Sequence, residues 1–343
     1  MSGWFTKSGP MQDVVISSRV RLARNFKSLS FPTSENIKSA EESISIVKKA
    51  VDSVKNLNFK VIDLGSLPQL DQEYLVEIHM MSTDMVGKKI PTALVIKEGN
   101  ENLAVMVNEE DHLRIQSLMP GLQLEDAYKQ CLEFEGIAEF QPKYAFSHEI
   151  GYLTSCPTNT GTGLRASAMV HLPALEKTDK MESLIDQCRK MGVAVRGFHG
   201  ENTKSLGSCY QISNQVTMGF TEHEIISGID NLIKNIIQLE REARETLRSK
   251  FGITFDDMIF RAYGILTNAR MLTSEEALRL LSELKLGIDL GMFAEYDTTD
   301  IIALMSNVQP ASLQKISGKI LSPGERDILR ANIIREKLKS KTE

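Results

Sequence analysis

The sequence of 343 residues has little cysteine, a single tryptophan and no long apolar run. Its four cysteines are too far apart to form a metal-binding or redox pair, and no HExxH motif occurs, which argues against a zinc site. No stretch approaches the length of a membrane span, and the N-terminal region lacks a signal-peptide core. Isolated cysteines in such a chain predict a reducing, cytoplasmic location without membrane attachment.

An excess of positive charge is also missing, since the formal net charge is -5. This balance argues against direct binding of nucleic acid, so any site for an anion must be local. Hydrophobic residues make up 42% of the chain and charged residues 25%, as in soluble globular proteins. The length allows two domains.

The first part of the chain has the pattern of a sheet with helices outside it. Residues 14–24 alternate between apolar and polar side chains, as a strand does. One face of this strand is predicted to carry Val14, Ile16, Val20 and Leu22, and the other Ser17, Arg19 and Arg21. A hairpin is predicted from 93–96 and 103–107, further strands at 143–155, 192–197 and 209–218, and helices at 36–56, 70–82 and 122–139. Strands joined by hairpins with helices outside predict an α+β fold around an antiparallel sheet.

The rest of the chain is predicted to be helical. Thr221 and Glu224 form a capping box at the start of a long helix whose apolar pattern fades near residue 250. Only helices are predicted after that point, at 254–268, at 274–286 with Ser274 as its cap, at 297–305 and from 322 onward. We therefore expect a catalytic α+β domain over 1–250 and a small all-α domain over 251–343.

The segment SCPTNTGTGLRAS (155–167) crowds a cysteine, two glycines and an arginine between two apolar runs. It fits the loose dinucleotide pattern G-x-G-x-x-A, but that reading needs a helix directly after the loop, and Pro173 would shorten it. A Walker phosphate loop is excluded because no Gly-Lys-Ser/Thr follows. A nucleophilic Cys156 would need a histidine base, for which His148, His171 and His199 are available.

Arginines and glutamates recur where predicted strands end. The arginines are Arg19, Arg21, Arg114, Arg165 and Arg196. One guanidinium group can donate two parallel hydrogen bonds to the oxygens of a phosphate. Five such groups in an acidic protein therefore suggest a pocket for a polyphosphate. Glu109, Glu110 and Glu201 could bind a cationic acceptor, and one could take its proton while a nitrogen attacks. Phosphoryl transfer needs this combination of charge neutralisation and positioning.

Four of these segments resemble, in order, motifs of the ATP:guanidino phosphotransferases, the family of arginine and creatine kinases. They are SSRVRLARN (17–25), NEEDHLR (108–114), CPTNTGTGLRAS (156–167) and RGFHGE (196–201), with YQISNQ after them. The family fold that this resemblance implies is an antiparallel sheet flanked by helices. It agrees with the pattern of the sequence.

The resemblance implies a role for each matching residue. The five arginines would bind the phosphates of ATP, and His79 would pack near the adenine. Glu110 and Glu201 would clamp the acceptor guanidinium, with one as base, and Glu109 would act through water on Mg²⁺. Cys156 would lie beside the guanidinium and tune its electrostatics without a covalent intermediate.

The arrangement is most similar to the bacterial members that phosphorylate arginine side chains in proteins. The helical domain that precedes the SRVR segment in the small-molecule kinases is expected to be absent, and a helical domain follows instead. There, RDILRA (326–331) resembles a phosphoarginine-binding motif, with Arg326, Asp327 and Arg330 as its binding residues. Thr160 and His199 depart from the small-molecule kinases.

This resemblance implies partners as well. They are protein substrates with exposed arginines, including a heat-shock repressor, together with an activator protein, the Clp protease machinery and a second copy in a homodimer. A kinase for free arginine and a silent phosphoarginine-binding adaptor are the rival functions. The complete set of arginines and glutamates argues against the adaptor.

Overall fold

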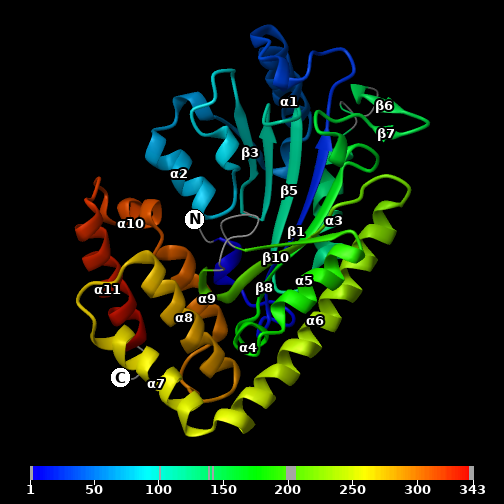
Figure 1. Cartoon of the computed structure of the whole chain (residues 1–343). Helices are drawn as coiled ribbons and strands as arrows, with labels where there is room; N and C mark the ends of the chain where they lie inside the picture. Colours follow the sequence, from blue (N-terminus) through cyan, green and yellow to red (C-terminus); the bar gives the residue numbers. More distant parts are fainter. Residues whose placement is uncertain (1–2, 100–101, 138–139, 141–142, 198–205, 340–343) are drawn as a thin grey trace.

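An eight-stranded antiparallel sheet runs through the centre of the protein (Figure 1). The computed structural model describes residues 3–99, 102–137, 140, 143–197 and 206–339. The strands are β1 (Val15–Arg24), β2 (Phe59–Asp63), β3 (Ala93–Lys97), β4 (Leu103–Val107), β5 (Leu113–Pro120), β8 (Leu164–His171), β9 (Val193–Gly197) and β10 (Cys209–Asn214). Their order is β2-β3-β4-β5-β1-β8-β10-β9, so β1 lies near the middle. The predicted α+β fold is confirmed.

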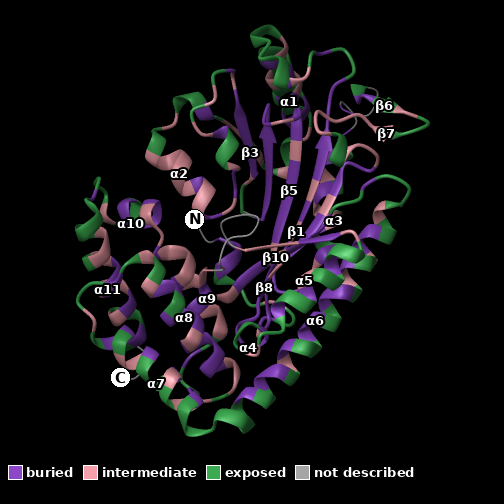
Figure 2. Ribbon diagram, in the orientation of Figure 1, coloured by how far each residue is buried: buried purple, intermediate pink, exposed green. Residues whose placement is uncertain are grey.

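One face of the sheet is covered by helices of the first part of the chain. These are α1 (Ile37–Ser53), α3 (Leu124–Glu135), α4 (Pro173–Lys177), α5 (Met181–Lys190) and α6 (Glu222–Phe251). Their apolar sides and that face of the sheet share one large core, while their outer sides are exposed (Figure 2). The predicted capping box at Thr221 and Glu224 begins α6.

The other face of the sheet carries a smaller apolar cluster. It contains Trp4 and Phe5, residues of β3 and β4, and side chains around α2 (Gln69–Glu77). The prediction that Ile16 shares a face with Val20 is wrong, because the pairing register of β1 with β8 shifts between Val15 and Ser17. Such a bulge moves one residue to the opposite face, and Ile16 packs with Trp4 instead.

Two other predictions of local structure are wrong. Residues 143–155 do not form one strand but a small hairpin of β6 (Phe146–Ser147) and β7 (Gly151–Tyr152), where Gly151 turns the chain with φ 85°. The cap of α8 (Ser274–Asp289) is Thr273, whose side chain accepts the backbone N–H of Glu276. Strands β5 and β8 fall outside the predicted set because they are buried on both faces, which removes the alternating pattern.

The C-terminal helices are α7 (Ile253–Asn268), α8, α9 (Thr298–Asn307), α10 (Pro310–Ser317) and α11 (Pro323–Lys339). Helix α9 packs against the segment Trp4–Thr6, and α10 packs against α2, so this helical part borders the second face of the sheet. The boundary near residue 250 stays a proposal. Among the described residues, no helix has the length and apolar character that crossing a membrane requires.

Candidate active site

Four of the five predicted arginines share one face of the sheet. Arg19 and Arg21 lie two residues apart on β1, which is about 6.6 Å along a strand. Arg165 of β8 stands directly opposite Arg21, and Arg114 of β5 stands opposite Ala23. Directly opposed residues share a face, so these guanidinium groups form a row across three strands.

Arg196 lies on the same face of the sheet, on the edge strand. It stands on β9 opposite Gln211 of β10, whose side chain lines a cavity on the same face. The antiparallel register therefore places all five predicted arginines on one face of the sheet. They come from four separate segments of the sequence.

Burial and mutual repulsion disfavour the charged form of two arginines in this row. Burial and the charges of Arg114 and Arg165 lower the pKa of Arg19 to about 10. Burial and three neighbouring arginines also lower the pKa of Arg21, well below its ordinary value. The Nε of Arg21 is buried and has no hydrogen-bond partner among the described residues. A phosphate chain would satisfy such a row, because its oxygens accept several charged hydrogen bonds at once.

Glu109 begins the acidic run and is tied to this row. Its buried carboxylate forms an ion pair with Arg114 and accepts the backbone N–H of Glu110. Burial alone would raise the pKa of Glu109, but Arg114 and these hydrogen bonds lower it below its ordinary value. The Lys88 ammonium donates hydrogen bonds to the backbone carbonyls of Asn108 and Glu109 and so fixes the backbone of this acidic segment. Glu109 therefore stays ionised beside the arginines.

Glu110, the next residue, lines a small cavity together with Arg21 and Arg165. Burial, followed by the charges of Asp111 and Glu109, raises its pKa above the ordinary glutamate value. Asp111 fixes the backbone beside it, accepting hydrogen bonds from the Asn25 side chain at 2.6 Å and from the Ser155 N–H at 2.7 Å. A carboxylate with a raised pKa and a fixed position is suited to accept a proton.

The glycines of the loop 156–163 allow it to pass close to other backbone. Gly161 has φ 113°, and a Cβ there would lie 2.4 Å from the carbonyl oxygen of Thr217. Gly163 has φ 64°, and a Cβ there would lie 2.6 Å from the carbonyl oxygen of Ala23. The loop leads into strand β8 and not into a helix, so the dinucleotide-binding alternative is wrong.

Arg24, the last residue of β1, holds this loop in place through buried contacts. Its buried guanidinium pairs with Glu135 at 2.5 Å and lies 3.5 Å from the centre of the Tyr152 ring. It also donates to the carbonyl oxygens of Ala23 and Thr162. The loop is therefore held by buried contacts, although its surface is polar.

Cys156 begins the loop and is half-buried, with its Sγ 3.0 Å from the Thr158 hydroxyl. Of its candidate bases, His171 is fully buried with its Nε2 2.7 Å from the Ser282 hydroxyl, and His148 is exposed. His199 lies outside the described residues. The structure gives the covalent-cysteine alternative no support from the described histidines.

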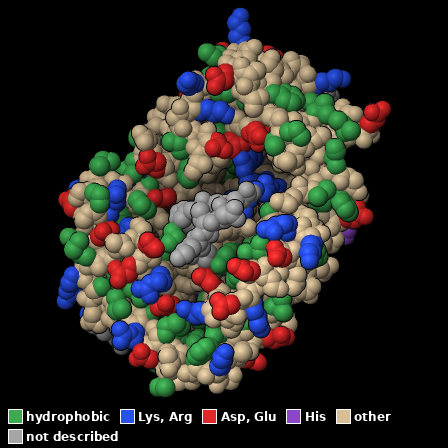
Figure 3. Space-filling model, viewed as in Figure 1, with side chains coloured by type: hydrophobic (Ala, Val, Ile, Leu, Met, Phe, Trp, Pro, Cys, Tyr) green, Lys and Arg blue, Asp and Glu red, His purple; other side chains and the backbone are tan. Residues whose placement is uncertain are grey.

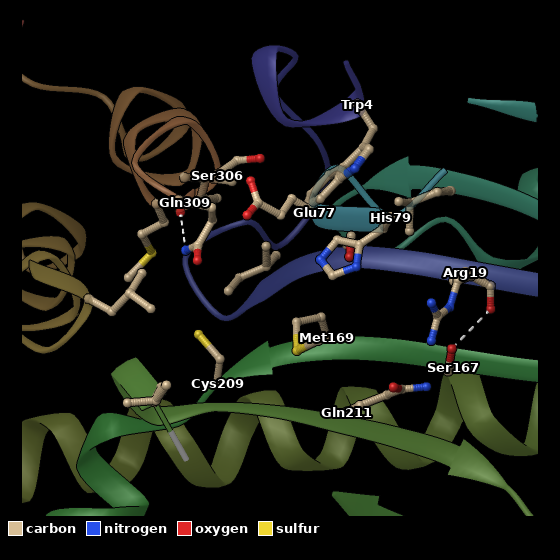
Figure 4. Close-up of a pocket in the computed structure, with 17 residues that line it drawn as sticks. Trp4, Arg19, Glu77, His79, Ser167, Met169, Cys209, Gln211, Ser306 and Gln309 are labelled. Carbon is tan, nitrogen blue, oxygen red and sulfur yellow. Dashed lines mark hydrogen bonds between the residues drawn. The ribbon is translucent and has the colours of Figure 1, made fainter. Parts of the chain in front are cut away.

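Two cavities follow one another along the arginine row. The smaller, of about 80 Å³, is lined by Arg21, Arg114, Arg165, Glu109, Glu110 and Asn159 among others. The larger, of about 220 Å³, begins at Arg19 and Ser167 and extends past His79 to the C-terminal helices (Figure 4). Acidic and basic side chains both border the hollow at the middle of this face of the molecule (Figure 3).

The remaining predicted residues are distributed as follows. His79 lines the larger cavity, and burial, with a smaller effect of Arg19, lowers its pKa to about 4. Glu201 lies outside the described residues.

The predicted phosphoarginine-binding residues lie on α11. Arg330 is buried, and its guanidinium donates to the carbonyls of Val308 and Leu272, the Ser274 hydroxyl and the Asp327 carboxylate. Arg326 and Asp327 are partly exposed on the same helix.

Several residues that line the larger cavity were not identified from the sequence alone. Ser17 and Ser167 line the larger cavity, and their positions two residues from Arg19 and Arg165 on a strand could have identified them. Gln211 also lines it, but it has no arginine near it in the sequence and stands opposite Arg196 only through strand pairing. Asp111 was part of the acidic run. Trp4, Glu77 and Gln309 carry no local signal, because only the tertiary fold brings them to the cavity.

Burial of His112 predicts that the stability of the protein depends on pH. Its buried ring accepts the Phe26 N–H at Nδ1 and donates from Nε2 to the Ser30 carbonyl, and burial lowers its pKa to about 4. Between about pH 6.5 and 4 the unfolded chain binds a proton that the folded chain does not. Stability is therefore complete above this range and falls as the pH falls, by roughly 3 kcal/mol for this group.

Urea unfolding across this range checks the prediction. The change in unfolding free energy with pH should be smaller in His112→Gln than in the wild type, whatever the variant's absolute stability. His223→Gln, at an exposed position of α6, serves as control and should keep the wild-type slope. A wild-type slope in His112→Gln would contradict the assignment.

The chain is similar to known proteins over nearly all its length. A family model for the ATP:guanido phosphotransferase C-terminal catalytic domain matches residues 42–243, and one for the protein-arginine kinase McsB C-terminal domain matches residues 252–343. The protein-arginine kinase of Halothermothrix orenii is 43% identical over 98% of this chain and 97% of that protein. The one from Geobacillus stearothermophilus is 40% identical over 100% of this chain and 95% of that protein.

Solved structures show the same fold for the larger part of the chain. The duplicated taurocyamine kinase from Schistosoma mansoni matches with a TM-score of 0.61 and 25% identity, over 71% of this chain and 36% of that one. Lombricine kinase matches with a TM-score of 0.59 and 23% identity, over 69% of this chain and 70% of that one. The resemblance seen in the four motifs is therefore confirmed. The chain belongs to the ATP:guanido phosphotransferase family.

Proposed function

We propose that the protein is an ATP-dependent protein-arginine kinase, which transfers the γ-phosphate of ATP to the guanidinium groups of arginine side chains in proteins. The observation that carries the proposal is the smaller cavity, where Arg21, Arg114 and Arg165 meet Glu110. Cations for phosphate and a carboxylate for a cationic acceptor share one small space. The likeness to protein-arginine kinases along the whole chain supports the protein acceptor.

The nucleotide would lie along the arginine row. Its phosphates would occupy the smaller cavity, and its base and sugar the larger one, because the register of β1 and β8 sets the two cavities side by side. Arg19, at the junction, would reach the phosphates nearer the sugar. His79, uncharged because of its burial, would pack near the base. Arg196, on the same face, would complete the phosphate contacts.

The acceptor guanidinium would approach Glu110. This carboxylate would orient the attacking nitrogen and take its proton, and Glu201 would hold the second side of the guanidinium. The arginines would neutralise the charge of the group in transfer within a partly desolvated site, where each contact is worth more than in water. Cys156, at the start of the glycine loop, would tune the electrostatics of the acceptor.

Magnesium fits this site as a companion of the nucleotide. Among the described residues, no group of three or more His, Cys, Asp or Glu side chains could hold a metal ion by itself. Mg²⁺ commonly keeps several waters and is bound by substrate phosphates with one or two carboxylates, and the ionised Glu109 is suited to act through such a water. When bound, the ion supplies charge neutralisation at the phosphates.

Further parts of the proposal concern regulation. Arg326 and Asp327 would contact phosphoarginine, and Arg330, with its donors engaged inside the fold, would hold Asp327 in place. We also propose cytoplasmic protein substrates that include a heat-shock repressor, transfer of the marked proteins to a Clp-type protease, an activator protein and a homodimer.

Incubation with Mg-ATP and an unfolded arginine-rich protein tests the function. Acid-labile phosphate should appear on the protein, and a version of the same protein with lysine in place of every arginine should remain unlabelled. Free arginine serves as the competing acceptor. Label on free arginine alone would contradict the protein kinase, and label on neither acceptor would contradict any arginine kinase.

A further inference from the structure

The far end of the larger cavity is closed by the C-terminal helices. Leu278 of α8, with Ile302, Met305 and Ser306 of α9, lines this end, together with Gln309, which precedes α10. Figure 4 shows Gln309, Ser306 and Glu77 gathered at one end of the cavity and Arg19, Ser167 and Gln211 at the other. All five of these C-terminal residues lie beyond residues 42–243, which match the catalytic-domain family model.

This end has the chemistry of a site for a flat heterocycle. Leu278, Ile302 and Met305 provide apolar walls, and Ser306 and Gln309 are only partly buried where they border the cavity. The Gln309 side chain donates from Nε2 to the Met305 carbonyl at 2.9 Å. Its Oε1 accepts no hydrogen bond among the described residues. An acceptor oxygen thus stands at an apolar slot, as recognition of an amino-substituted ring requires.

Glu77 fixes this wall to the catalytic part of the chain. Its carboxylate accepts the backbone N–H groups of Ala311 and Ser312, both at 2.7 Å, and the Ser312 hydroxyl at 2.9 Å. These N–H groups belong to the first turn of α10, where a carboxylate is favourable. Because Gln309 is the residue before α10, the same contacts hold its position. Glu77 stands at the end of α2, two residues before His79, and itself lines the cavity.

We propose that the C-terminal helices form the base-reading wall of the nucleotide site, in which the Gln309 side-chain carbonyl accepts a hydrogen bond from the exocyclic amine of adenine. Glu77 is a positioning residue that holds this wall against the catalytic part. The inference rests on the proposed function, since the arginine row places the phosphates at the other end of the cavity. It makes nucleotide choice a property of both parts of the chain.

The single tryptophan makes a direct test possible. Trp4 lines the same cavity, so its fluorescence reports on occupancy at that position. The probes are ATP and purine riboside triphosphate, which lacks the exocyclic amine. The wild type should bind ATP about five- to tenfold more tightly than the purine analogue, as one hydrogen bond allows. Gln309→Leu should bind ATP about five- to tenfold more weakly than the wild type and lose the preference.

Two further variants complete the design. Asn307→Leu changes the last residue of α9, two positions before Gln309 and outside the cavity lining, and should keep the wild-type affinities. Glu77→Gln should weaken both nucleotides by about tenfold, because an amide opposes one of the two N–H groups that the carboxylate accepts. Urea unfolding of each variant separates loss of folding from loss of binding. Wild-type affinity and preference in Gln309→Leu would overturn the base contact, and unchanged affinities in Glu77→Gln would overturn the positioning role.

The outcome separates this inference from the proposed function. If proteins are phosphorylated on arginine while Trp4 fluorescence does not respond to ATP, the base binds elsewhere, and the inference fails although the function stands. If Gln309 controls ATP binding but no phosphoarginine forms, the function fails and the base-reading wall stands.

Discussion

Glu110→Gln is expected to lower kcat by about 10²- to 10⁴-fold while leaving the affinity for ATP nearly unchanged. The carboxylate faces the same small cavity as Arg21 and Arg165, and its raised pKa suits it to take a proton. Glutamine keeps the shape of the side chain but neither attracts the acceptor guanidinium nor accepts its proton. Transfer of phosphate should therefore fail after the nucleotide has bound.

The measurement combines initial rates of protein phosphoarginine formation with an ATP titration. Glu149→Gln, at an exposed position of the β6–β7 turn, makes the same chemical change outside the site and should behave as the wild type. If Glu110→Gln retained its kcat but lost affinity for ATP, Glu110 would belong to the nucleotide and not to the acceptor.

Arg21→Gln is expected to lower kcat/KM by about 10³-fold or more, since an arginine that stabilises a phosphoryl group in transfer contributes on this scale. The same change should make the ligand-free protein more stable. Arg21 lies among other arginines, its pKa is lowered by burial and by their charges, and its Nε has no hydrogen-bond partner among the described residues. Its removal relieves this repulsion.

Thermal unfolding with and without ATP checks this pair of effects. The melting temperature of ligand-free Arg21→Gln should rise by about 2 °C, and the additional stabilisation by ATP should largely disappear. Arg189→Gln removes an exposed arginine from α5 and should change neither quantity. A lower melting temperature together with wild-type activity would show that Arg21 serves the fold and not the phosphates.

Much of the architecture could be predicted from local pattern. Helices α6 to α9 have apolar periodicity, α6, α8 and α9 also have a side-chain N-cap, and the structure has all four close to the predicted ranges. The prediction failed where pattern is weak. Strand β8 contains Ala166 and Ala168 on its buried side and has apolar residues on both faces, so it shows no clear alternation.

The chemistry of the site could also be predicted, although its geometry could not. The arginines and glutamates are visible as types in unusual density, and four ordered motifs identify the family. That Arg21 stands opposite Arg165, and that Ile16 turns away from Val20, depends on the pairing register and on one bulge in β1. Register is a property of two strands together, and no single segment contains it.

The sequence by itself determined the residue types available for phosphoryl transfer, the α+β class of the first part and the helical character of the last. These follow from side-chain chemistry and from periodicity over short stretches of chain. Only the tertiary structure decided that the arginines form one row, that two cavities continue each other, and that Gln309 and Glu77 meet at the end of the larger one. The reason is that these contacts join residues far apart in the chain, whose meeting is set by strand pairing and by the packing of α10 on α2.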